Sequence, residues 1–286
     1  GYTTCMDELE ARDFRGTYFL SGTGTYSSAL WAKFEAAFKK GHELATHTRS
    51  HWCIPIPRTQ YIQEIDSNIL DITSHTSATE QDLITHAYPC GFVTQEIKDL
   101  IKDPLLWNFL SARGYHINNF EAQSPEDYFN LRSLNTPNFH DPPLAPPNYL
   151  DVINQVEING KWAGLVLHNE CTDQGSINAL PSKNIWVDTI GNVVKYISLR
   201  DNSQITDFTL SDNQINFTIS TPIKYKNIIY NQNLTLQLSI QNSKTVTSVT
   251  LDSIKVPYIQ LKSETENTLK FNISFPISHN IIINMQ

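Results

Sequence analysis

The sequence predicts an α/β domain over residues 1–206, followed by a small all-β domain over residues 207–286. In the first segment, short apolar runs alternate with helical patterns, and repeated βα units of this kind build a parallel sheet or barrel. The composition changes at Asp207: all 11 Gly, all five Trp and all four Cys lie before it, whereas the last 80 residues contain no Gly, Ala, Trp or Cys. Two different kinds of chain are therefore joined near residue 206.

The first βα unit is expected between residues 16 and 41. Gly16 is followed by the β-branched, aromatic and aliphatic residues 17–20, a pattern that favours a buried strand at 16–20. A helix is predicted next, because Ser27-Ser28 offers an N-cap and apolar residues then recur on one helical face until Gly41 ends it. These apolar residues are Leu30, Phe34, Ala37 and Phe38.

The remaining units continue this alternation. Strands are predicted at residues 42–45, 83–88, 130–134 and 162–168, helices at 59–74, 94–101, 104–113 and 187–200, and an amphipathic stretch at 148–156. The helix at 104–113 is predicted because a proline suits a first helical turn. In such a fold the active site lies at the carboxyl ends of the strands.

From Asp207 the apolar period changes to two, as in Phe208, Leu210, Ile215, Phe217 and Ile219. Six to eight short strands of this type predict a small β-sandwich. Because the segment has no Gly, we expect Asn to take the positive φ angles of its turns. Strand edges can pair with a second copy, so self-association through this domain is a further expectation.

The charge balance and the distribution of apolar residues each argue against one class of protein. The chain has 29 acidic and 21 basic residues, a net charge of −8. Nucleic acid is therefore not an expected partner, because phosphate binding depends on clustered Lys and Arg. A transmembrane segment is not expected either, because no uninterrupted apolar run reaches the roughly 18 residues that a spanning helix needs.

The ends and the cysteines bear on the origin of the chain. It begins Gly1-Tyr2, without an initiator Met or a signal-peptide pattern, so we expect a processed or partial chain. The four cysteines (Cys5, Cys53, Cys90 and Cys171) form no CxxC pair, which leaves free buried thiols and a disulfide both open. Three glycosylation sequons, at Asn216, Asn233 and Asn272, favour a secreted glycoprotein.

The sharpest local motif is His47-Thr-Arg-Ser-His51, directly after a predicted strand. Two imidazoles four residues apart can present nitrogen lone pairs to one divalent metal, which is half of a typical zinc site. Their place at the carboxyl end of a strand, where this architecture binds ligands, supports that interpretation.

Two further loci follow predicted strands. His168 ends the strand at 162–168 and is either a general acid or base or a structural histidine. The segment Tyr88-Pro89-Cys90-Gly91 is either a simple turn or one that directs a backbone N–H at an oxyanion.

Taken in order, these loci resemble the polysaccharide deacetylase family, the carbohydrate esterases that share a NodB-type domain. The resemblance covers about residues 1–200 and rests on five elements and a closing helix. They are Gly1-Tyr2 as the end of an Asp-Asp-Gly-Tyr element, the second strand at 15–20, the His-Ser/Thr-X-X-His motif at 47–51, the segment 87–91, the Leu-Val-Leu-His segment at 165–168, and the helix at 187–200.

The resemblance implies a distorted (β/α) barrel of NodB type that holds one Zn²⁺, or Co²⁺ or another divalent metal. Two of the metal ligands would be His47 and His51. Thr48 would hold the loop that carries these ligands by hydrogen bonding. The backbone N–H of Cys90 would donate to the oxyanion, and Tyr88 and Pro89 would contact substrate. His168 would be the general acid.

Several departures accompany the resemblance. The family's two aspartates, the base and the third metal ligand, precede the Gly that matches Gly1, so we expect both upstream of Gly1 and expect the barrel to lack its first strand. Ala87 stands where many members carry an Arg that orients the base, and Cys90 replaces a common Tyr. Possible substitutes for the family's Asp-Trp motif are Asp127, Asn118 and Asp141.

The function that follows from the resemblance is metal-dependent deacetylation of an acetylated polysaccharide. An N-acetylglucosamine polymer such as chitin or peptidoglycan is the first expectation and O-acetylated xylan the second, in a secreted, extracellular or cell-wall-associated protein. The alternative is a catalytically inactive scaffold that binds glycan or serves assembly. A metalloprotease is disfavoured, because the motif at 47–51 lacks the Glu of HExxH enzymes.

Overall fold

A computed structural model describes residues 2–114, 120–135, 149–167, 174–221, 232–274 and 278–286. The chain divides into two compact units, residues 1–194 and 195–286, and each is described here by itself. The division falls within helix α7 (Ile190–Asn202), before the change in composition at residue 207.

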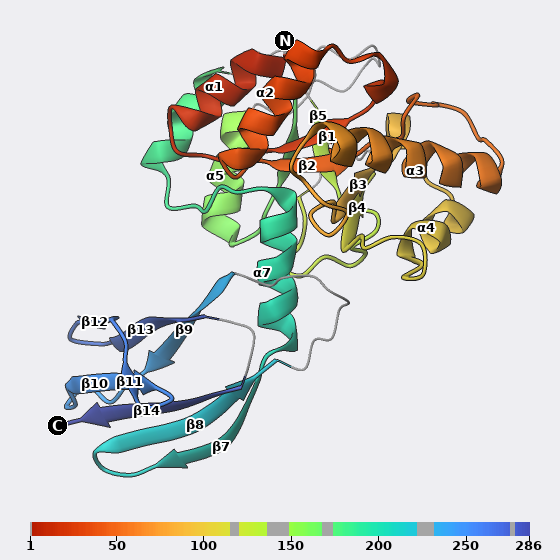
Figure 1. Cartoon of the computed structure of the whole chain (residues 1–286). Helices are drawn as coiled ribbons and strands as arrows, with labels where there is room; N and C mark the ends of the chain where they lie inside the picture. The colour runs from red at the N-terminus through yellow and green to blue at the C-terminus, as the bar shows by residue number, and fades with distance from the viewer. Residues whose placement is uncertain (1, 115–119, 136–148, 168–173, 222–231, 275–277) are drawn as a thin grey trace. The chain divides into compact units, whose positions relative to one another are not determined.

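The first unit is built on parallel strands, as the sequence predicts (Figure 1). Its four-stranded sheet has the order β1 (Thr17–Leu20), β2 (Glu43–Thr46), β3 (Thr85–Ala87) and β4 (Ser111–Arg113). A parallel bridge from Arg113 to Leu131 extends it, and β5 (Ser133–Asn135) pairs in parallel with β6 (Gly164–Val166). This is the strand arrangement of a distorted (β/α) barrel.

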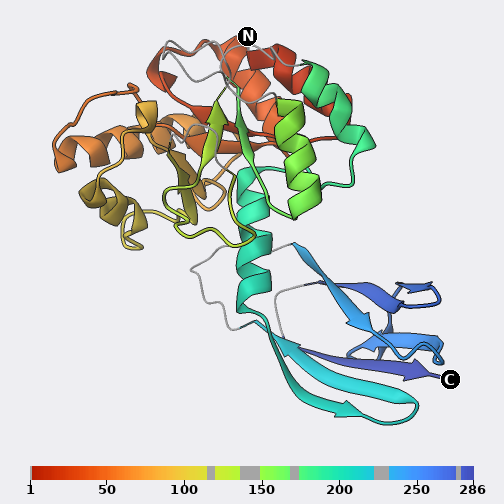
Figure 2. The same cartoon turned by 180° about the vertical axis from the view of Figure 1, so that it is seen from behind.

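Helices surround these strands (Figures 1 and 2). They are α1 (Tyr2–Glu10), α2 (Ser28–Lys39), α3 (Arg58–His75), α4 (Gln95–Lys102), α5 (Tyr149–Asn159), α6 (Gln174–Ala179) and α7, with short 3₁₀ turns η1 (Thr23–Thr25), η2 (Pro89–Gly91) and η3 (Leu180–Ser182). Ser27 caps α2 as predicted, accepting a hydrogen bond from Leu30 N–H at 3.3 Å. Helix α1 was not predicted.

The core of the first unit lies between the sheet and the helices. It includes apolar residues from β1, β2, α2, α3, α4 and the approach to β3, namely Leu20, Leu44, Trp31, Phe34, Ala37, Tyr61, Ile65, Ile72, Leu83, Leu100 and Ile101. This packing fixes the strand ends from which the candidate site is built.

The helix predicted at residues 104–113 is wrong. Residues 104–106 form only a turn after α4, and residues 111–113 are strand β4. The run Trp107 to Leu110 is apolar because it approaches a buried strand, with Trp107, Phe109 and Leu110 all packed inside. A short continuous apolar run fits a buried strand as well as a helix, and here the strand forms.

The amino ends of the strands are tied to helix α7 by a buried carboxylate. Glu43 accepts hydrogen bonds from Thr17 Oγ1 at 2.7 Å, Thr85 Oγ1 at 2.9 Å and Gly191 N–H at 2.9 Å. A Cβ on Gly191 would lie 2.6 Å from Glu43 Oε1, so this position requires glycine. The opposite, carboxyl ends of the strands carry the candidate site.

The second unit consists of two antiparallel sheets. Their strands are β7 (Gln204–Leu210), β8 (Gln214–Ser220), β9 (Asn233–Ser239), β10 (Val246–Leu251), β11 (Ile254–Lys255), β12 (Tyr258–Lys262), β13 (Asn267–Ser274) and β14 (His279–Met285). One sheet has the order β11-β10-β14-β8-β7 and the other β12-β13-β9. Alternating residues of β8, β13 and β14 are buried, as the period of two predicts.

The expected use of Asn in the turns of this unit is wrong for its described residues. The positive φ angles there belong to Asp207, Asp252 and Ser253. Asp252 and Ser253 form the two-residue turn between β10 and β11, since Leu251 pairs with Ile254. A turn of this length commonly needs two positive φ angles, and Asp tolerates one better than most residues do.

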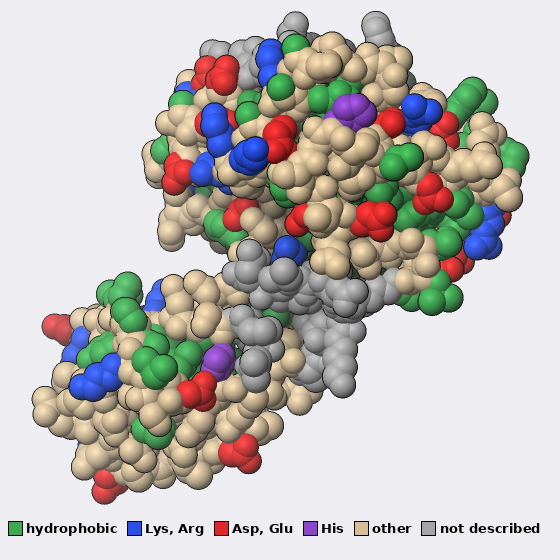
Figure 3. Space-filling view, viewed as in Figure 1, with side chains coloured by type: hydrophobic (Ala, Val, Ile, Leu, Met, Phe, Trp, Pro, Cys, Tyr) green, Lys and Arg blue, Asp and Glu red, His purple; other side chains and the backbone are tan. Residues whose placement is uncertain are grey.

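Among the residues that the structure describes, no helix is both long enough and apolar enough to cross a membrane. The face of the molecule in Figure 3 shows Lys and Arg interspersed with Asp and Glu, without a continuous basic area on that face.

Candidate functional site

The two histidines of the predicted metal motif lie in the loop that leaves the carboxyl end of β2. Their ring centroids are 4.6 Å apart and nearly perpendicular. His47 is buried, and its Nδ1 lies 2.8 Å from the carbonyl oxygen of Ala87. A carbonyl only accepts hydrogen bonds, so Nδ1 carries the proton and Nε2 keeps the lone pair with which an imidazole binds a metal.

Both imidazoles are held neutral. Burial, and next the positive charge of Arg113, lower the pKa of His47 well below its usual value. Burial also lowers the pKa of His51. Neutral imidazole is the form that ligates a divalent cation, so this pair fits the metal that the resemblance implies.

The backbone of the loop is unusual at this point. Thr48 and His51 have φ angles of 57° and 55°, and Cys90, on the facing turn, has 52°. Non-glycine residues seldom adopt this left-handed region, and such strain persists only where the surroundings enforce it, often at functional sites.

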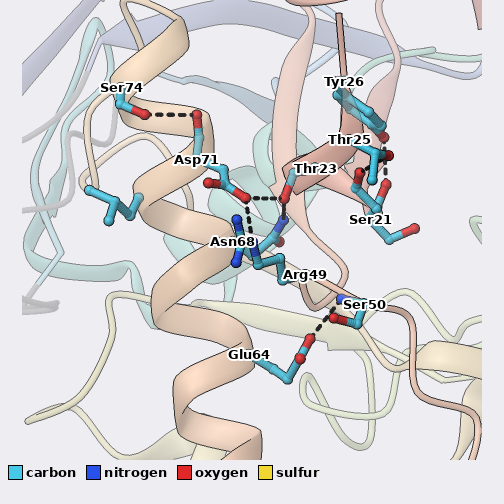
Figure 4. Close-up of polar contacts among 12 residues, drawn as sticks. Ser21, Thr23, Thr25, Tyr26, Arg49, Ser50, Glu64, Asn68, Asp71 and Ser74 are labelled. Carbon is cyan, nitrogen blue, oxygen red and sulfur yellow. Dashed lines mark hydrogen bonds and ion pairs between the residues drawn. The ribbon is translucent and has the colours of Figure 1, made fainter.

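Hydrogen bonds to side chains of helix α3 hold the loop in this conformation (Figure 4). Asn68 Oδ1 accepts a hydrogen bond from His47 N–H at 3.1 Å, and Glu64 accepts one from Ser50 N–H at 2.7 Å. Asp71 accepts from Arg49 Nε at 2.9 Å. Glu64, Asn68 and Asp71 lie on one face of α3 because they are four and three residues apart.

Thr23 closes this network from η1. Its hydroxyl donates to Asp71 at 2.7 Å and accepts a hydrogen bond from Asn68 Nδ2 at 3.2 Å. Asn68 is fully buried, so its side-chain amide depends on His47 N–H and Thr23 Oγ1 for hydrogen-bond partners.

The role expected for Thr48 is corrected by these contacts. Thr48 is fully buried, and its Oγ1 has no hydrogen-bond partner among the described residues. The side chains of α3, and not the Thr48 hydroxyl, hold the loop after β2.

The segment after β3 lies next to this loop, but two of its residues do not have their expected role. Tyr88 is fully buried and donates its hydroxyl to the carbonyl of Phe129 at 2.8 Å, and Pro89 is also buried. Neither side chain is available to a polysaccharide chain. Cys90, in contrast, is exposed.

A disulfide joins Cys53 of the loop after β2 to Cys90 of the turn after β3, with a Cα–Cα distance of 5.3 Å. Cys5 is disulfide-bonded as well. The sequence was compatible with either free thiols or a disulfide, and in the structure Cys5, Cys53 and Cys90 are disulfide-bonded. The Cys53–Cys90 bond covalently connects the loop that carries His51 to the turn that carries the expected oxyanion N–H.

Arg113 is a buried cation beside this site that the sequence did not single out. It pairs with Ala87 across β3 and β4, and its guanidinium lies over the Phe19 ring, 4.8 Å from the centroid. Burial lowers the pKa of Arg113 to about 10. No carboxylate among the described residues forms an ion pair with Arg113, and its buried Nε has no hydrogen-bond partner within the same residues.

His86 is a third buried imidazole, on β3 behind the pair. Its Nδ1 lies 2.8 Å from Thr46 Oγ1 and its Nε2 lies 3.0 Å from the Tyr61 hydroxyl. Burial, together with the charge of Arg113, lowers the pKa of His86 to about 3. With both nitrogens engaged, His86 supports the site and is not a metal ligand.

Trp52, next to His51, is the large aromatic side chain that the site leaves exposed. Its exposed fraction is 43%. Its indole Nε1 lies 3.3 Å from Glu64 Oε1, so the carboxylate that holds Ser50 also orients this ring. Because Trp52 directly follows His51 in the sequence, it could have been predicted as a residue of the site.

Three of the remaining expectations lie outside the described residues: His168, Asn118 and Asp141. Asp127 is described, and it forms an ion pair with Lys98 at 2.7 Å while accepting a hydrogen bond from Phe129 N–H at 2.9 Å. These contacts explain Asp127 as a structural residue.

Comparison with known proteins agrees with the resemblance. Residues 1–104 match the family model for polysaccharide deacetylases, the family that the sequence resembles. No curated protein matches the chain significantly.

Several solved structures are similar to the chain. One is a CE4 family pseudoenzyme from Bacillus anthracis, at 13% identity and a TM-score of 0.44 over 67% of this chain and 59% of that one. Another is a family 4 acetyl xylan esterase from Clostridium thermocellum in complex with a cobalt ion, at 14% identity and a TM-score of 0.45 over 66% and 82%. A third is a peptidoglycan N-acetylglucosamine deacetylase, at 12% identity and a TM-score of 0.43 over 66% and 78%. The chain spans about three fifths of the pseudoenzyme chains, 61% and 59% in two of them.

Proposed function

We propose that this protein removes acetyl groups from a polysaccharide in a metal-dependent reaction, with a polymer of N-acetylglucosamine as the first candidate substrate. The observation that carries the proposal is the neutral His47–His51 pair, on a strained loop at the carboxyl end of β2. The pair lies within the residues that match the deacetylase model.

His47 and His51 would hold a divalent cation such as Zn²⁺ or Co²⁺. The bound ion supplies Lewis acidity, which polarises an acyl carbonyl and acidifies water. A catalytic zinc usually has three protein ligands, and the third remains the Asp that the resemblance implies. His47 contributes through Nε2, since its Nδ1 donates to Ala87.

The backbone N–H of Cys90 is the proposed donor to the acyl oxygen as it becomes an oxyanion. The neighbouring amides are already used, because Gly91 N–H donates to Tyr88 O and Phe92 N–H donates to Pro89 O, both at 3.0 Å. A preorganised amide at such a position stabilises the transition state more than the ground state. His168 remains the proposed acid for the leaving group.

Arg113 is the proposed substitute for the cation that the family carries at the position of Ala87. The two residues are direct partners across the parallel strands β3 and β4, so the Arg113 side chain starts from the position next to Ala87 on the same face of the sheet. A buried cation is costly without a compensating anion. We assign to Arg113 the orientation of the carboxylate base, and its charge adds to burial, the larger cause, in keeping the imidazole pair neutral.

Trp52 is the proposed contact for the sugar ring. An indole offers a broad apolar face together with a polar N–H, and Glu64 already fixes that N–H. A ring beside His51 would bind the pyranose next to the acetyl group that reacts.

The test is acetate release by the full-length protein from acetylated chitin and peptidoglycan oligomers and from acetylated xylan. We expect release from the N-acetylglucosamine substrates that stops with a chelator and returns with added zinc or cobalt. No release from any of these substrates at saturating metal would overturn the proposed activity.

A scaffold or assembly role is the second candidate, and strand β7 favours it. All seven residues of β7 are exposed at the edge of their sheet, and Ile205, Phe208 and Leu210 are each more than half exposed. Apolar edge strands pair with other chains. Sedimentation of the wild type and of Leu210→Lys tests assembly through β7, with Leu105→Lys as control. A dimer that only Leu210→Lys dissociates supports it, and a monomeric wild type excludes this assembly.

Secretion or attachment to a cell wall is part of the same proposal. The Cys53–Cys90 disulfide and the second disulfide at Cys5 support it, since such bonds persist in oxidising compartments.

A further inference from the structure

The disulfide beside the imidazole pair conceals a second set of metal-ligating atoms. A ring nitrogen of His51 and the sulfurs of Cys53 and Cys90 all lie within 4.8 Å of one another. While the two sulfurs are bonded to each other, neither can be a thiolate, and thiolate is the form in which Cys binds a metal.

The spacing of these atoms suits a thiophilic cation. Cys53 Sγ lies 3.6 Å from His51 Nδ1. A tetrahedral zinc, with bonds of about 2.3 Å to sulfur and about 2.05 Å to nitrogen, holds such a pair about 3.6 Å apart. The two sulfurs would need to separate to about 3.8 Å, which opening the disulfide permits.

The disulfide is also accessible to a reductant. Cys53 and Cys90 are both exposed, and His51 is partly exposed. Exposed disulfides are more readily reduced than buried structural ones.

We infer that reduction of Cys53–Cys90 creates a thiolate–imidazole site, formed by Cys53, Cys90 and His51, for zinc or another thiophilic divalent cation. This inference goes beyond the proposed deacetylation and does not depend on it. Because His51 belongs to both ligand sets, reduction would draw a cation from the His47–His51 pair towards sulfur.

The reduction is a two-electron thiol–disulfide exchange. A small thiol such as glutathione attacks one sulfur and a second thiol resolves the mixed disulfide, so that two external thiols become one disulfide. The S–S bond breaks, each cysteine sulfur gains one proton, and both protons leave when the cation binds.

The test measures the reduced fraction of each cysteine in glutathione redox buffers, with and without buffered free zinc, by alkylation and mass spectrometry of the full-length protein. With zinc at ten times its Kd for the reduced Cys53–Cys90–His51 site and well below its Kd for the oxidised protein, the equilibrium for reducing Cys53–Cys90 should shift about tenfold, or roughly 30 mV. The disulfide at Cys5 is the internal control and should not shift. An unchanged Cys53–Cys90 equilibrium, or an equal shift at Cys5, overturns the inference.

Two variants identify the nitrogen ligand. His51→Gln should abolish the zinc-dependent shift, whereas His75→Gln, an exposed histidine on α3, should retain it. A shift that survives in His51→Gln also overturns the inference. Absence of acetate release bears on the proposed activity alone, because the redox measurement needs no turnover.

Discussion

His47 Nδ1 lies 2.8 Å from the carbonyl oxygen of Ala87 and donates its proton to it. This one contact connects the loop after β2 to strand β3 and leaves Nε2 as the free nitrogen. When one ring nitrogen of a histidine binds a metal, a hydrogen bond from the other nitrogen orients the ring and raises the basicity of the ligating nitrogen. His86, in contrast, is a buried histidine whose two nitrogens both have hydrogen-bond partners within the protein.

Asn68→Ala should weaken metal binding although Asn68 touches no metal. The change removes the acceptor for His47 N–H and the donor to Thr23 Oγ1. Loss of such supporting contacts typically lowers metal affinity about 10- to 100-fold. Calorimetric titration with zinc measures the effect, and Ser74→Ala, an exposed position on the same helix, is the control. Equal affinities in the two variants would contradict the role assigned to Asn68.

Arg113→Met should move the pH dependence of zinc binding. Burial and Arg113 hold the pKa values of His47 and His51 below the ordinary value of about 6.5, so protons compete with zinc only at lower pH. In the wild type, affinity should therefore stay constant as pH falls through 6.5 and decline only below it. Removing the positive charge raises both pKa values, so the decline should begin at higher pH.

Titrations at several pH values distinguish this effect from a general loss of structure. Arg58→Met, an exposed arginine at the start of α3, should follow the wild-type profile. A decline at the same pH in the wild type and in Arg113→Met would show that Arg113 does not keep the imidazoles neutral.

Parts of this site could be predicted from the sequence because they are local. His47 and His51 share one loop, and the Ser27 cap and the apolar face of α2 are set by nearby residues. Arg113, Asn68 and the Cys53–Cys90 bond depend instead on which strands and helices become neighbours. Strand β4 was assigned to a helix, so the pairing of Arg113 with Ala87 could not be foreseen.

The burial of Tyr88 and Pro89 was missed for a related reason. A turn after a strand is usually exposed, and its position alone indicated substrate contact. Here the Tyr88 hydroxyl finds a partner in Phe129, 41 residues away in the sequence, and the ring fills the core. Sequence spacing carries no information on a contact of that range.

Trp52→Ala should raise KM for an oligosaccharide substrate and leave kcat unchanged. The indole would bind the sugar equally in the ground state and the transition state, and such uniform binding affects KM alone. An aromatic contact of about 1 kcal/mol corresponds to roughly a fivefold change. Leu105→Ala, at 92% exposure on the turn after α4, is the control. A fall in kcat with KM unchanged would place Trp52 in the reaction itself.

Gly191→Ala should destabilise the first unit without changing the imidazole pair. The added Cβ would lie 2.6 Å from Glu43 Oε1 and 2.9 Å from Ile84 Cδ1. Overpacking of this kind costs about 1–3 kcal/mol, which a lower Tm should reveal. Gly164→Ala, whose Cβ would meet nothing closer than 3.6 Å, is the matched control. Equal Tm values in the two variants would contradict the close approach of α7 to Glu43.

The most direct measurement of the central claim is zinc titration of the oxidised, full-length protein and of its His47→Gln, His51→Gln and His75→Gln variants. One zinc ion should bind per wild-type chain and per His75→Gln chain. In His47→Gln and His51→Gln the affinity should fall at least about 100-fold, because each change removes a ligand outright, which exceeds the loss of a supporting contact. Zinc binding of equal strength in all four proteins would contradict the assignment of His47 and His51 as a metal site.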